Sequence, residues 1–494
     1  MFKYYYYSLF FLLSTIYSAS QVQLGGDING ALENCLSGIS LDLSSDGSIL
    51  AIGSPFSYDG SGTNGFVKVY KFNGINWDQI GDDIIGDFNG DVFGYSLSLS
   101  ADGTILAIGA PKDDGNGENS GRVSVYEYSG GNWNQLGNDL YGTFPGRQLG
   151  SDVSLSSDGL KLAIGQEWIG GGTVFIYRYE SGSWISSGTI SGERSGDRFG
   201  NNLELSYDGS ILAISAPYND GVTGTNYSAG HVRVFENQSG GWTQLGDDID
   251  GIAAGDLFGS SMDISSDGKV IAIGAPHNGG GGNQKGQVKV LEYESGSWTQ
   301  IGNDINGETN YDGAGWGVSL SDNGYILAVG IPFDDNSSGI DSGRIVLYQN
   351  LSGIWTQIGN DIYGEAANNF LGWNGMEISN EGKTFGVAAI GNDNSEIDSG
   401  LVRVYDLNNI VLSDDENENL KCELFPVPTR DFLSVAINNN SVYSIFDIRG
   451  KKLKAGNLNS GNNQIDLLNF ENGVYLIEIK GEEKSAYKRK IIKI

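Results

Sequence analysis

One short turn recurs along most of this chain and constrains its fold. In residues 93–133 the turn is Ser100-Ala101-Asp102-Gly103, between two predicted strands, and further strands follow at 122–126 and from Trp133. The turn glycine returns at Gly47, Gly103, Gly159, Gly209, Gly268, Gly324 and Gly382, at intervals of 50 to 59 residues. Four short strands per unit at such a period are typical of a β-propeller, with one blade per unit. The sequence therefore predicts an all-β chain with a seven-bladed β-propeller.

The ends of the repeat region predict how the ring closes. The fourth-strand pattern occurs six times, at Trp77, Trp133, Trp184, Trp242, Trp298 and Trp355. The missing copy lies near the N-terminus, where residues 21–28 match residues 133–140 position by position. We therefore expect the N-terminal strand to complete the last blade and to cover an edge that would otherwise be exposed.

Four segments are expected. Residues 1–20 combine Lys3, an apolar run and small residues before Gln21, as in a secretory signal peptide. The propeller is predicted over 21–408, an acidic linker over 409–419, and a small C-terminal β-sandwich over 420–494. After signal cleavage no stretch is long and apolar enough for a transmembrane segment. Cys35 and Cys422 form a disulfide or remain two separate thiols; the sequence leaves both possibilities open.

The formal charge of −32 is unevenly distributed. Residues 420–494 hold 12 Lys/Arg and 8 Asp/Glu, a net of +4, so residues 1–419 carry −36. Such an acidic propeller repels nucleic acid, which is not expected as a partner. The charge either keeps the protein soluble or attracts a cation or a basic partner.

The repeat resembles a known family in its recurring dipeptides. Phe93-Gly94 with Gly109-Ala110-Pro111 resembles the FG-GAP repeat of the integrin α-subunit propeller, and similar pairs return at Phe199-Gly200 and Phe258-Gly259. Calcium-binding blades of that family carry several carboxylates in the first hairpin loop. Here the loop is only Ser-x-Asp-Gly, and one carboxylate cannot supply the six to eight oxygens that calcium takes. We therefore interpret these aspartates as turn formers. No cofactor is expected; calcium binding is possible, but no defined motif in the sequence supports it.

The C-terminal segment resembles the C-terminal sorting domain of the type IX secretion system of Bacteroidetes. The resemblance rests on Phe425-Pro426-Val427-Pro428-Thr429, on residues 445–451 and 472–477, and on the basic end at 488–494. Val427 departs from the family, which usually has Asn there. The resemblance implies that the type IX secretion machinery recognises residues 420–494 and that the protein is secreted or held on the outer cell surface. A permanent binding module on the same fold is the alternative.

The loops that vary between blades are the expected recognition surface, because uniform turns suit a scaffold. Exposed rings beside carboxylates suit sugars. The candidate ligand-binding residues on these loops are Tyr58, Asp59, Asp113, Asp114, Trp168, Tyr218, Asp220, Tyr227 and Phe333. A weaker candidate metal loop contains Asp334, Asp335, Asn336 and Asp341. These side chains alternatively cap the gaps between blades and solvate the loops.

Evidence for catalysis is thin. The chain has two histidines, His231 and His277, outside any zinc-type spacing, and it lacks the common nucleophile and nucleotide motifs. The leading hypothesis is a non-enzymatic, adhesin-like propeller that recognises a polysaccharide or a surface protein. The alternatives are a glycan-degrading hydrolase or lyase on the same scaffold and a structural surface-layer component.

Overall fold

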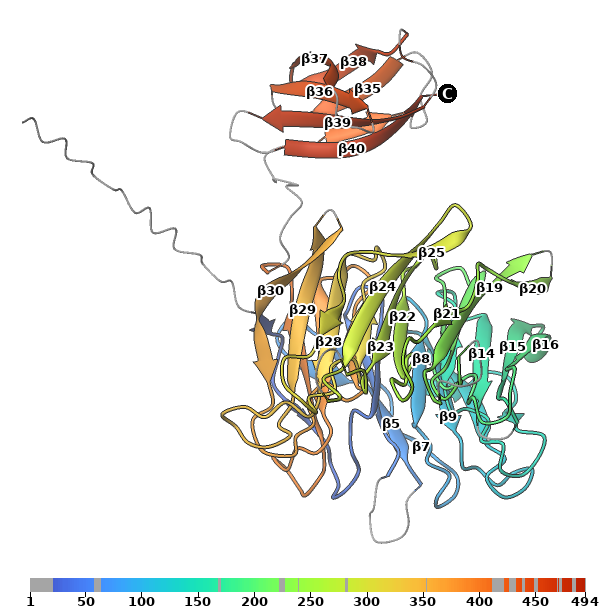
Figure 1. Cartoon of the computed structure of the whole chain (residues 1–494). Helices are drawn as coiled ribbons and strands as arrows, with labels where there is room; N and C mark the ends of the chain where they lie inside the picture. The colour runs from blue at the N-terminus through green and yellow to red at the C-terminus, as the bar shows by residue number, and fades with distance from the viewer. Residues whose placement is uncertain are drawn as a thin grey trace, which may run out of the picture. The chain divides into compact units, whose positions relative to one another are not determined.

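The computed structural model describes most of the chain, namely residues 21–56, 64–167, 170–221, 227–238, 240–279, 283–351, 353–410, 422–425, 432–437, 440–447, 452–468, 470, 473–481 and 486–493. Every regular element within these ranges is a β-strand, which confirms the all-β expectation (Figure 1). The chain divides into two compact units after Val411. The predicted signal peptide and most of the predicted linker lie outside the described residues. Ile410, which the sequence placed in the linker, is buried in the first unit.

The described residues of the first unit form seven antiparallel sheets, which are numbered in chain order. The first sheet is β3 (Ser40–Leu43), β4 (Ile49–Ser54), β5 (Phe66–Phe72), β6 (Trp77–Gln79) and β7 (Ile84–Ile85). The second is β8 (Ser96–Leu99), β9 (Ile105–Ala110), β10 (Arg122–Ser129), β11 (Asn132–Gln135) and β12 (Leu140–Tyr141). The third is β13 (Val153–Leu155), β14 (Lys161–Gln166), β15 (Thr173–Glu180) and β16 (Ser183–Ser191).

The later sheets repeat this order. The fourth is β17 (Leu203–Leu205), β18 (Ile211–Ala216), β19 (His231–Gln238), β20 (Gly241–Gln244) and β21 (Ile249–Asp250). The fifth is β22 (Ser261–Ile264), β23 (Val270–Ala275), β24 (Gln287–Glu294), β25 (Ser297–Gln300) and β26 (Ile305–Asn306). The sixth is β27 (Val318–Leu320), β28 (Ile326–Ile331), β29 (Arg344–Leu351) and β30 (Ile354–Tyr363). The seventh is β31 (Met376–Ile378), β32 (Thr384–Ala389) and β33 (Leu401–Asp406), joined by β1 (Val22–Gln23) and β2 (Ile28–Asn29).

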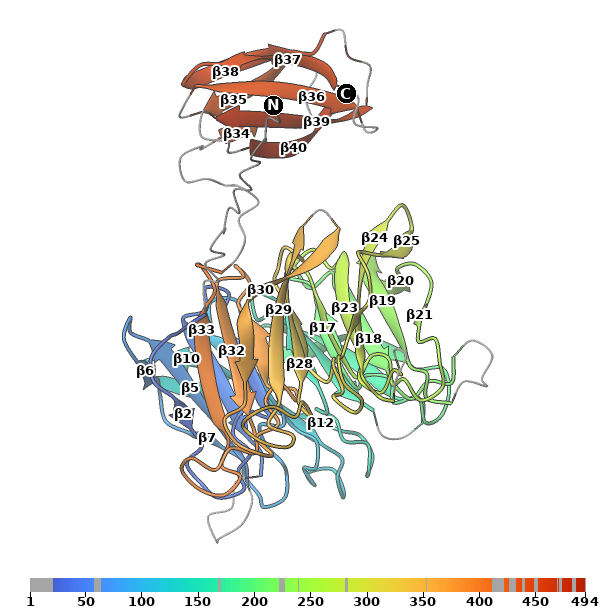
Figure 2. The same ribbon diagram turned by 60° about the vertical axis from the view of Figure 1, so that its left-hand side comes forward.

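The seventh sheet combines both ends of the unit. Val22 pairs with Asp406 and Ile28 pairs with Val402, so β1 and β2 form the outer edge beside β33 (Figure 2). The carboxylate of Asp27 accepts two hydrogen bonds of 2.8 Å from Arg403. Backbone pairing and a bidentate ion pair therefore hold the N-terminal segment in this sheet.

The Ser-x-Asp-Gly turn is stabilised by its own side chains. Ser100 Oγ donates to Asp102 Oδ1 at 2.8 Å and accepts from the backbone N–H of Ile105 at 2.9 Å. Gly103 has a φ of 68°, in the left-handed region that glycine adopts without strain. The turn-forming role predicted for Asp102 is confirmed.

Neighbouring turns are also bonded to one another. The second turn residue in each sheet donates its N–H to the carbonyl of its counterpart in the next sheet, along Ser45, Ala101, Ser157, Tyr207, Ser266, Asp322 and Asn380, and Glu381 N–H then donates to Ser45. The first strands contact in the same cyclic order, with β31 returning to β3. The seven sheets therefore surround a central axis lined by their first strands.

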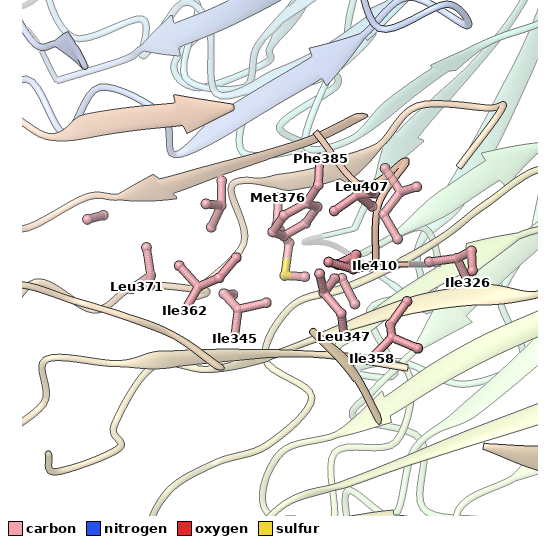
Figure 3. Packing of buried hydrophobic residues seen from close by; sticks show 14 of the residues in the cluster. Ile326, Ile345, Leu347, Ile358, Ile362, Leu371, Met376, Phe385, Leu407 and Ile410 are labelled. Carbon is pink, nitrogen blue, oxygen red and sulfur yellow. The ribbon is translucent and has the colours of Figure 1, made fainter. Parts of the chain in front are cut away.

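Apolar side chains fill the space between neighbouring sheets. β9 reads Ile-Leu-Ala-Ile-Gly-Ala and is buried along its whole length, because it lies in the middle of a sheet that is covered on both faces. Figure 3 shows one interface, between the sixth and seventh sheets, which contains Ile326, Ile345, Leu347, Ile358, Ile362, Leu371, Met376, Phe385, Leu407 and Ile410. At the outer edge, the indole Nε1 of Trp133 donates to the carbonyl of Ile80 in the preceding sheet. The repeated tryptophans therefore connect adjacent sheets.

The second unit contains two small antiparallel sheets. One is β34 (Cys422–Phe425), β35 (Phe432–Ile437) and β38 (Gly461–Asp466), and the other is β37 (Lys452–Leu458), β36 (Ser441–Asp447), β39 (Gly473–Gly481) and β40 (Ala486–Lys493). Their inner side chains form one apolar core, which includes Leu433, Ile445 and Ile477. The sequence did not predict β34 as a strand.

Candidate functional site

A cavity of about 770 Å³ lies at one end of the central axis, on the side of the inter-sheet loops. Each sheet is preceded by a glycine, and the residue after that glycine lies at or beside the cavity. Ile39, Tyr95, Ser151, Asn201, Ser260 and Trp373 line it, and Trp316 stacks on Trp373 with ring centroids 5.4 Å apart. The wall is therefore aromatic and apolar on one side and polar on the other. The opposite end of the axis, between the Ser-x-Asp-Gly turns, holds only about 110 Å³.

Between the two ends, the same position of each first strand forms a ring. Its members are Asp42, Ser98, Ser154, Glu204, Asp263, Ser319 and Glu377. The shorter side chains connect neighbouring sheets: Asp42 accepts from Leu99 N–H at 2.6 Å, and Ser98 accepts from Leu155 N–H at 2.9 Å. Asp263 likewise accepts from Leu320 N–H at 2.6 Å. We call these seven residues the inner ring.

The two glutamates of the inner ring differ from the other members. No backbone amide of the next sheet donates to either of them among the described residues; Glu204 Oε2 accepts from Ser154 Oγ at 3.2 Å, and Glu377 Oε2 accepts from Ser319 Oγ at 3.4 Å. Both line the 770 Å³ cavity as well as the narrow end. Their longer side chains place two carboxyl groups on the channel.

Burial governs the protonation of the inner ring. It raises the pKa of Asp42 and of Asp263 to about 7, although two backbone N–H groups on each carboxylate act in the opposite direction. Burial also raises the pKa of Glu204 and of Glu377 well above the ordinary value, and the negative charge of Asp263 adds to the effect in both. Because the glutamates lack the amide donors that favour the charged form, they retain protons most strongly.

An aromatic cluster forms one side of the cavity mouth. Trp373 and Phe370 line the cavity. Phe333 packs edge-on against Trp373 with centroids 5.3 Å apart, and His277 packs edge-on against Trp316 at 5.6 Å. The cluster exists because the sixth and seventh sheets both have Trp after the glycine, where the third to fifth have Ser or Asn. We call Trp316, Phe333, Phe370 and Trp373 the aromatic wall.

The polar side of the mouth is formed by the second to fourth sheets. Glu167 is buried, and its Oε2 accepts from Asn201 Nδ2 at 2.7 Å. Burial raises the pKa of Asp152 to about 7, and the carboxylate accepts from Leu203 N–H at 2.8 Å. Tyr95 is 40% exposed beside these groups. Rings therefore face carboxyl and amide groups across one cavity.

Among the predicted ligand-binding residues that the structure describes, only Phe333 lies at this site. Phe333 belongs to the aromatic wall. Tyr58, Asp59 and Trp168 lie outside the described residues. Tyr227 is 74% exposed on its loop, and the Tyr218 ring lies under the guanidinium of Arg198 at 4.2 Å.

Three predicted acids have structural partners instead. Asp113 is buried, and its Oδ2 lies 3.0 Å from Arg122 Nε, so this carboxylate is directed to an arginine. Its neighbour Asp114 accepts from Asn119 N–H at 2.7 Å and shapes the loop. Asp220 similarly accepts from Ser228 N–H at 3.1 Å.

The predicted metal loop is organised by hydrogen bonds and one ion pair. Asp334 Oδ2 lies 3.2 Å from Arg344 Nε, so this carboxylate is directed to an arginine. Asp335 Oδ1 accepts from Asp341 N–H at 2.9 Å, and Asn336 Oδ1 accepts from Ser338 N–H at 2.8 Å. These contacts account for the recurrence of Asp and Asn in the loop.

Sequence reasoning missed the inner ring and most of the aromatic wall. The signal for the ring was present, because its members lie two residues before the serine of each Ser-x-Asp-Gly turn. When the repeats are aligned, this position holds four acids and three serines. Within a single repeat, the same residue looks like an ordinary strand residue. Trp316 and Trp373 occupy the same aligned position, directly after glycine, so an alignment of the repeats also reveals this pair.

Cys35 is a buried free thiol, and its Sγ donates to the carbonyl of Ser399 at 3.1 Å. The side chain of Cys422 lies outside the described part of the chain.

Comparison with known proteins gives two family matches. Residues 88–126 match the FG-GAP repeat, and residues 423–493 match the secretion system C-terminal sorting domain, the type IX sorting tail. No curated protein matches the chain. The chain thus carries an FG-GAP-type β-propeller repeat and a type IX sorting domain, and the tail indicates a secreted or cell-surface protein. In the described residues, no helix has the length and apolar character needed to cross a membrane.

Proposed function

We propose that this protein is an extracellular binding protein that recognises a polysaccharide at the cavity between the aromatic wall and the polar side of the mouth. The observation that carries the proposal is the stacked pair of Trp316 and Trp373 beside a 770 Å³ cavity with carboxyl and amide groups opposite. Sugar rings offer apolar C–H faces to aromatic rings and hydroxyl groups to carboxylates, so both sides of the mouth find a partner in one ligand. Delivery to the cell exterior by the sorting domain agrees with such a ligand.

The test is a screen of the purified protein against arrayed glycans and soluble polysaccharides, with and without Ca²⁺. We expect one class of neutral polysaccharide to bind, and Trp373→Ala to weaken its binding at least tenfold, equivalent to about 1.4 kcal/mol. The matched control is Tyr325→Ala, which removes a 51% exposed ring beside a Ser-x-Asp-Gly-type turn away from the cavity.

Two results count against the proposal. Absence of binding to every polysaccharide tested overturns it. The second result is that the protein captures a surface protein and that neither Trp373→Ala nor Tyr325→Ala weakens this binding. Recognition would then take place elsewhere on the molecule.

A second function, polysaccharide cleavage, is favoured by the two glutamates. A carboxyl group with a raised pKa beside a ligand cavity is suited to donate a proton to a leaving oxygen, while an ionised neighbour acts as base or nucleophile. Glu204 and Glu377 meet the first condition. The test measures the release of new reducing ends from a polysaccharide that binds. Catalysis is established if Glu377→Gln abolishes this release and retains binding. Binding without product would exclude cleavage of that polysaccharide.

A further inference from the structure

Outside the cavity, one group of metal-ligating side chains stands out among the described residues. Glu193, His231 and Asp248 each offer a ligand atom, and these atoms all lie within 4.8 Å of one another. His231 is the first residue of β19, Asp248 directly precedes β21 in the same sheet, and Glu193 follows β16 of the third sheet. The group therefore spans the boundary between the third and fourth sheets.

The imidazole of His231 lacks a partner that its burial requires. The side chain is 1% exposed, and its Nε2 has no hydrogen-bond partner within the described structure. A buried polar nitrogen without a partner costs free energy, so such groups are rare in folded proteins unless a bound species satisfies them.

Two other sheets have arginine at this position. Arg122 and Arg344 are the first residues of β10 and β29, as His231 is of β19. Arg122 Nη1 contacts Asp87 and Asp139, and Arg344 Nη1 lies 3.5 Å from Glu308 and 3.2 Å from Asp361. In both cases one acid follows the preceding sheet. The other acid belongs to the outer edge of the same sheet, where Asp139 directly precedes β12 and Asp361 lies within β30.

Glu193 and Asp248 are the counterparts of those acids, but the arginine is replaced by a neutral histidine. Arg233, two residues further along β19, forms longer ion pairs with both acids, 3.8 Å from Glu193 Oε1 and 3.5 Å from Asp248 Oδ1. Its short hydrogen bonds, of 3.1 and 2.8 Å, go to Gln244 Oε1. In the seventh sheet the equivalent Arg403 reaches both of its acids at 2.8 Å. The acids of the fourth sheet are thus paired with Arg233 at longer distances than the acids of the seventh sheet are with Arg403.

We propose that Glu193, His231 and Asp248 bind a divalent transition metal ion, with Zn²⁺ as the best match, and that the ion joins the third and fourth sheets. Imidazole nitrogen and carboxylate oxygen are both ligand types of Zn²⁺, and sites with three protein ligands take water as the fourth, whereas Ca²⁺ takes oxygen ligands only. Ligands on tetrahedral Zn²⁺ lie about 3.4 Å apart. Side chains of Glu193 and Asp248 that are 44% and 32% exposed have room to close that distance, and they give the ion access from solvent.

The test is isothermal titration calorimetry of Zn²⁺ into full-length protein that has been freed of metal with a chelator and dialysed. We expect one Zn²⁺ per chain at micromolar or tighter affinity, with a rise in melting temperature. His231→Arg restores the side chain found in the second and sixth sheets, so we expect it to fold normally and to lose this binding. His277→Ala removes the other histidine, which packs on Trp316, and should bind Zn²⁺ as the unmodified protein does.

A second readout reports the ligand directly. Because the chain has only two histidines, imidazole NMR signals are readily assigned, and Zn²⁺ should shift those of His231 and leave those of His277 in place. Zn²⁺ binding that persists in a folded His231→Arg variant, through cysteines or surface acids, overturns the proposal. So does weak binding of several ions with no change at His231, or Ca²⁺ binding with equal affinity at the same residues.

Discussion

Replacing Glu204 by glutamine should make the first unit less sensitive to pH and more stable at neutral pH. Glu204 is part of the inner ring, where burial and the neighbouring carboxylates raise its pKa well above the ordinary value. In the unfolded chain the same glutamate ionises at about pH 4.3. Between those two pKa values the folded protein holds a proton that the unfolded chain has released, so stability falls as the pH rises. Glutamine resembles the protonated form and removes this dependence.

The size of the effect follows from proton linkage. A group that is protonated when folded and ionised when unfolded lowers the free energy of unfolding by about 1.4 kcal/mol for each pH unit. Over the two units from pH 5 to pH 7 this amounts to at most about 3 kcal/mol. Carboxylates whose pKa is lowered by folding, such as Asp27 and Asp102, act in the opposite direction only at more acidic pH. Other groups also titrate above pH 5, among them Asp152, whose pKa burial raises to about 7, and His231, whose pKa burial lowers. Because Glu204→Gln and the unmodified protein share these groups, the difference between the two proteins isolates Glu204.

Urea denaturation at pH 4, 5, 6 and 7, followed by tryptophan fluorescence, measures the effect. We expect Glu204→Gln and the unmodified protein to have similar stability at pH 4, and the variant to be more stable at pH 7. Glu127→Gln, on the exposed part of β10, is the control and should follow the unmodified protein throughout. Equal pH slopes for Glu204→Gln and the unmodified protein, or a variant that is less stable at pH 7, would refute the reasoning.

Two further perturbations test the framework around the site. Deleting residues 21–29 removes β1, β2 and the Asp27 partner of Arg403, so the first unit should melt at a clearly lower temperature in calorimetry; unchanged cooperative melting would show that the N-terminal strands are dispensable. Arg122→Met should cost about 3–5 kcal/mol in urea denaturation, because it leaves the buried Asp113 without its cation. Lys289→Met, which breaks a pair with Asp304 at 3.7 Å near the surface, should cost less than about 1 kcal/mol, and equal losses for the two variants would contradict this distinction.

The fold was predictable from the sequence because its main signals are local. A Ser-x-Asp-Gly turn forms from four consecutive residues, as the bonds of Ser100 and Asp102 show. It marks five of the seven sheets, and its serine and glycine recur in all seven. The position of β1 was predictable because residues 21–28 resemble the fourth strand of the other repeats. In those repeats the fourth strand pairs with the third, as β1 pairs with β33. In both cases the information lies within one repeat.

The site was much less predictable, because it depends on contacts between repeats. Asp113 and Asp114 are adjacent in sequence, yet one is buried against Arg122 and the other shapes an exposed loop. Nothing within the loop distinguishes them; the difference comes from an arginine on the next strand. The aromatic wall likewise combines loops from the sixth and seventh sheets with Phe333, whose neighbours are distant in sequence.

The repeats nevertheless provide an internal reference for finding functional positions. At the inner ring, Asp42 and Ser98 reach a backbone amide of the next sheet, so short polar residues at that position are explained by structure. A glutamate side chain is one methylene longer than that of aspartate. The amide of the fifth sheet that corresponds to those bound by Asp42 and Ser98 is that of Ile264, and it donates to Asp263 Oδ1 instead at 2.6 Å. The Glu204 carboxyl therefore accepts no hydrogen bond from that amide, and it lines the channel. His231 stands where the second and sixth sheets have Arg122 and Arg344, and beside it Arg233 pairs with Glu193 and Asp248 at only 3.8 and 3.5 Å. Both proposed sites thus lie where the residue at a repeated position differs from its counterparts in other sheets.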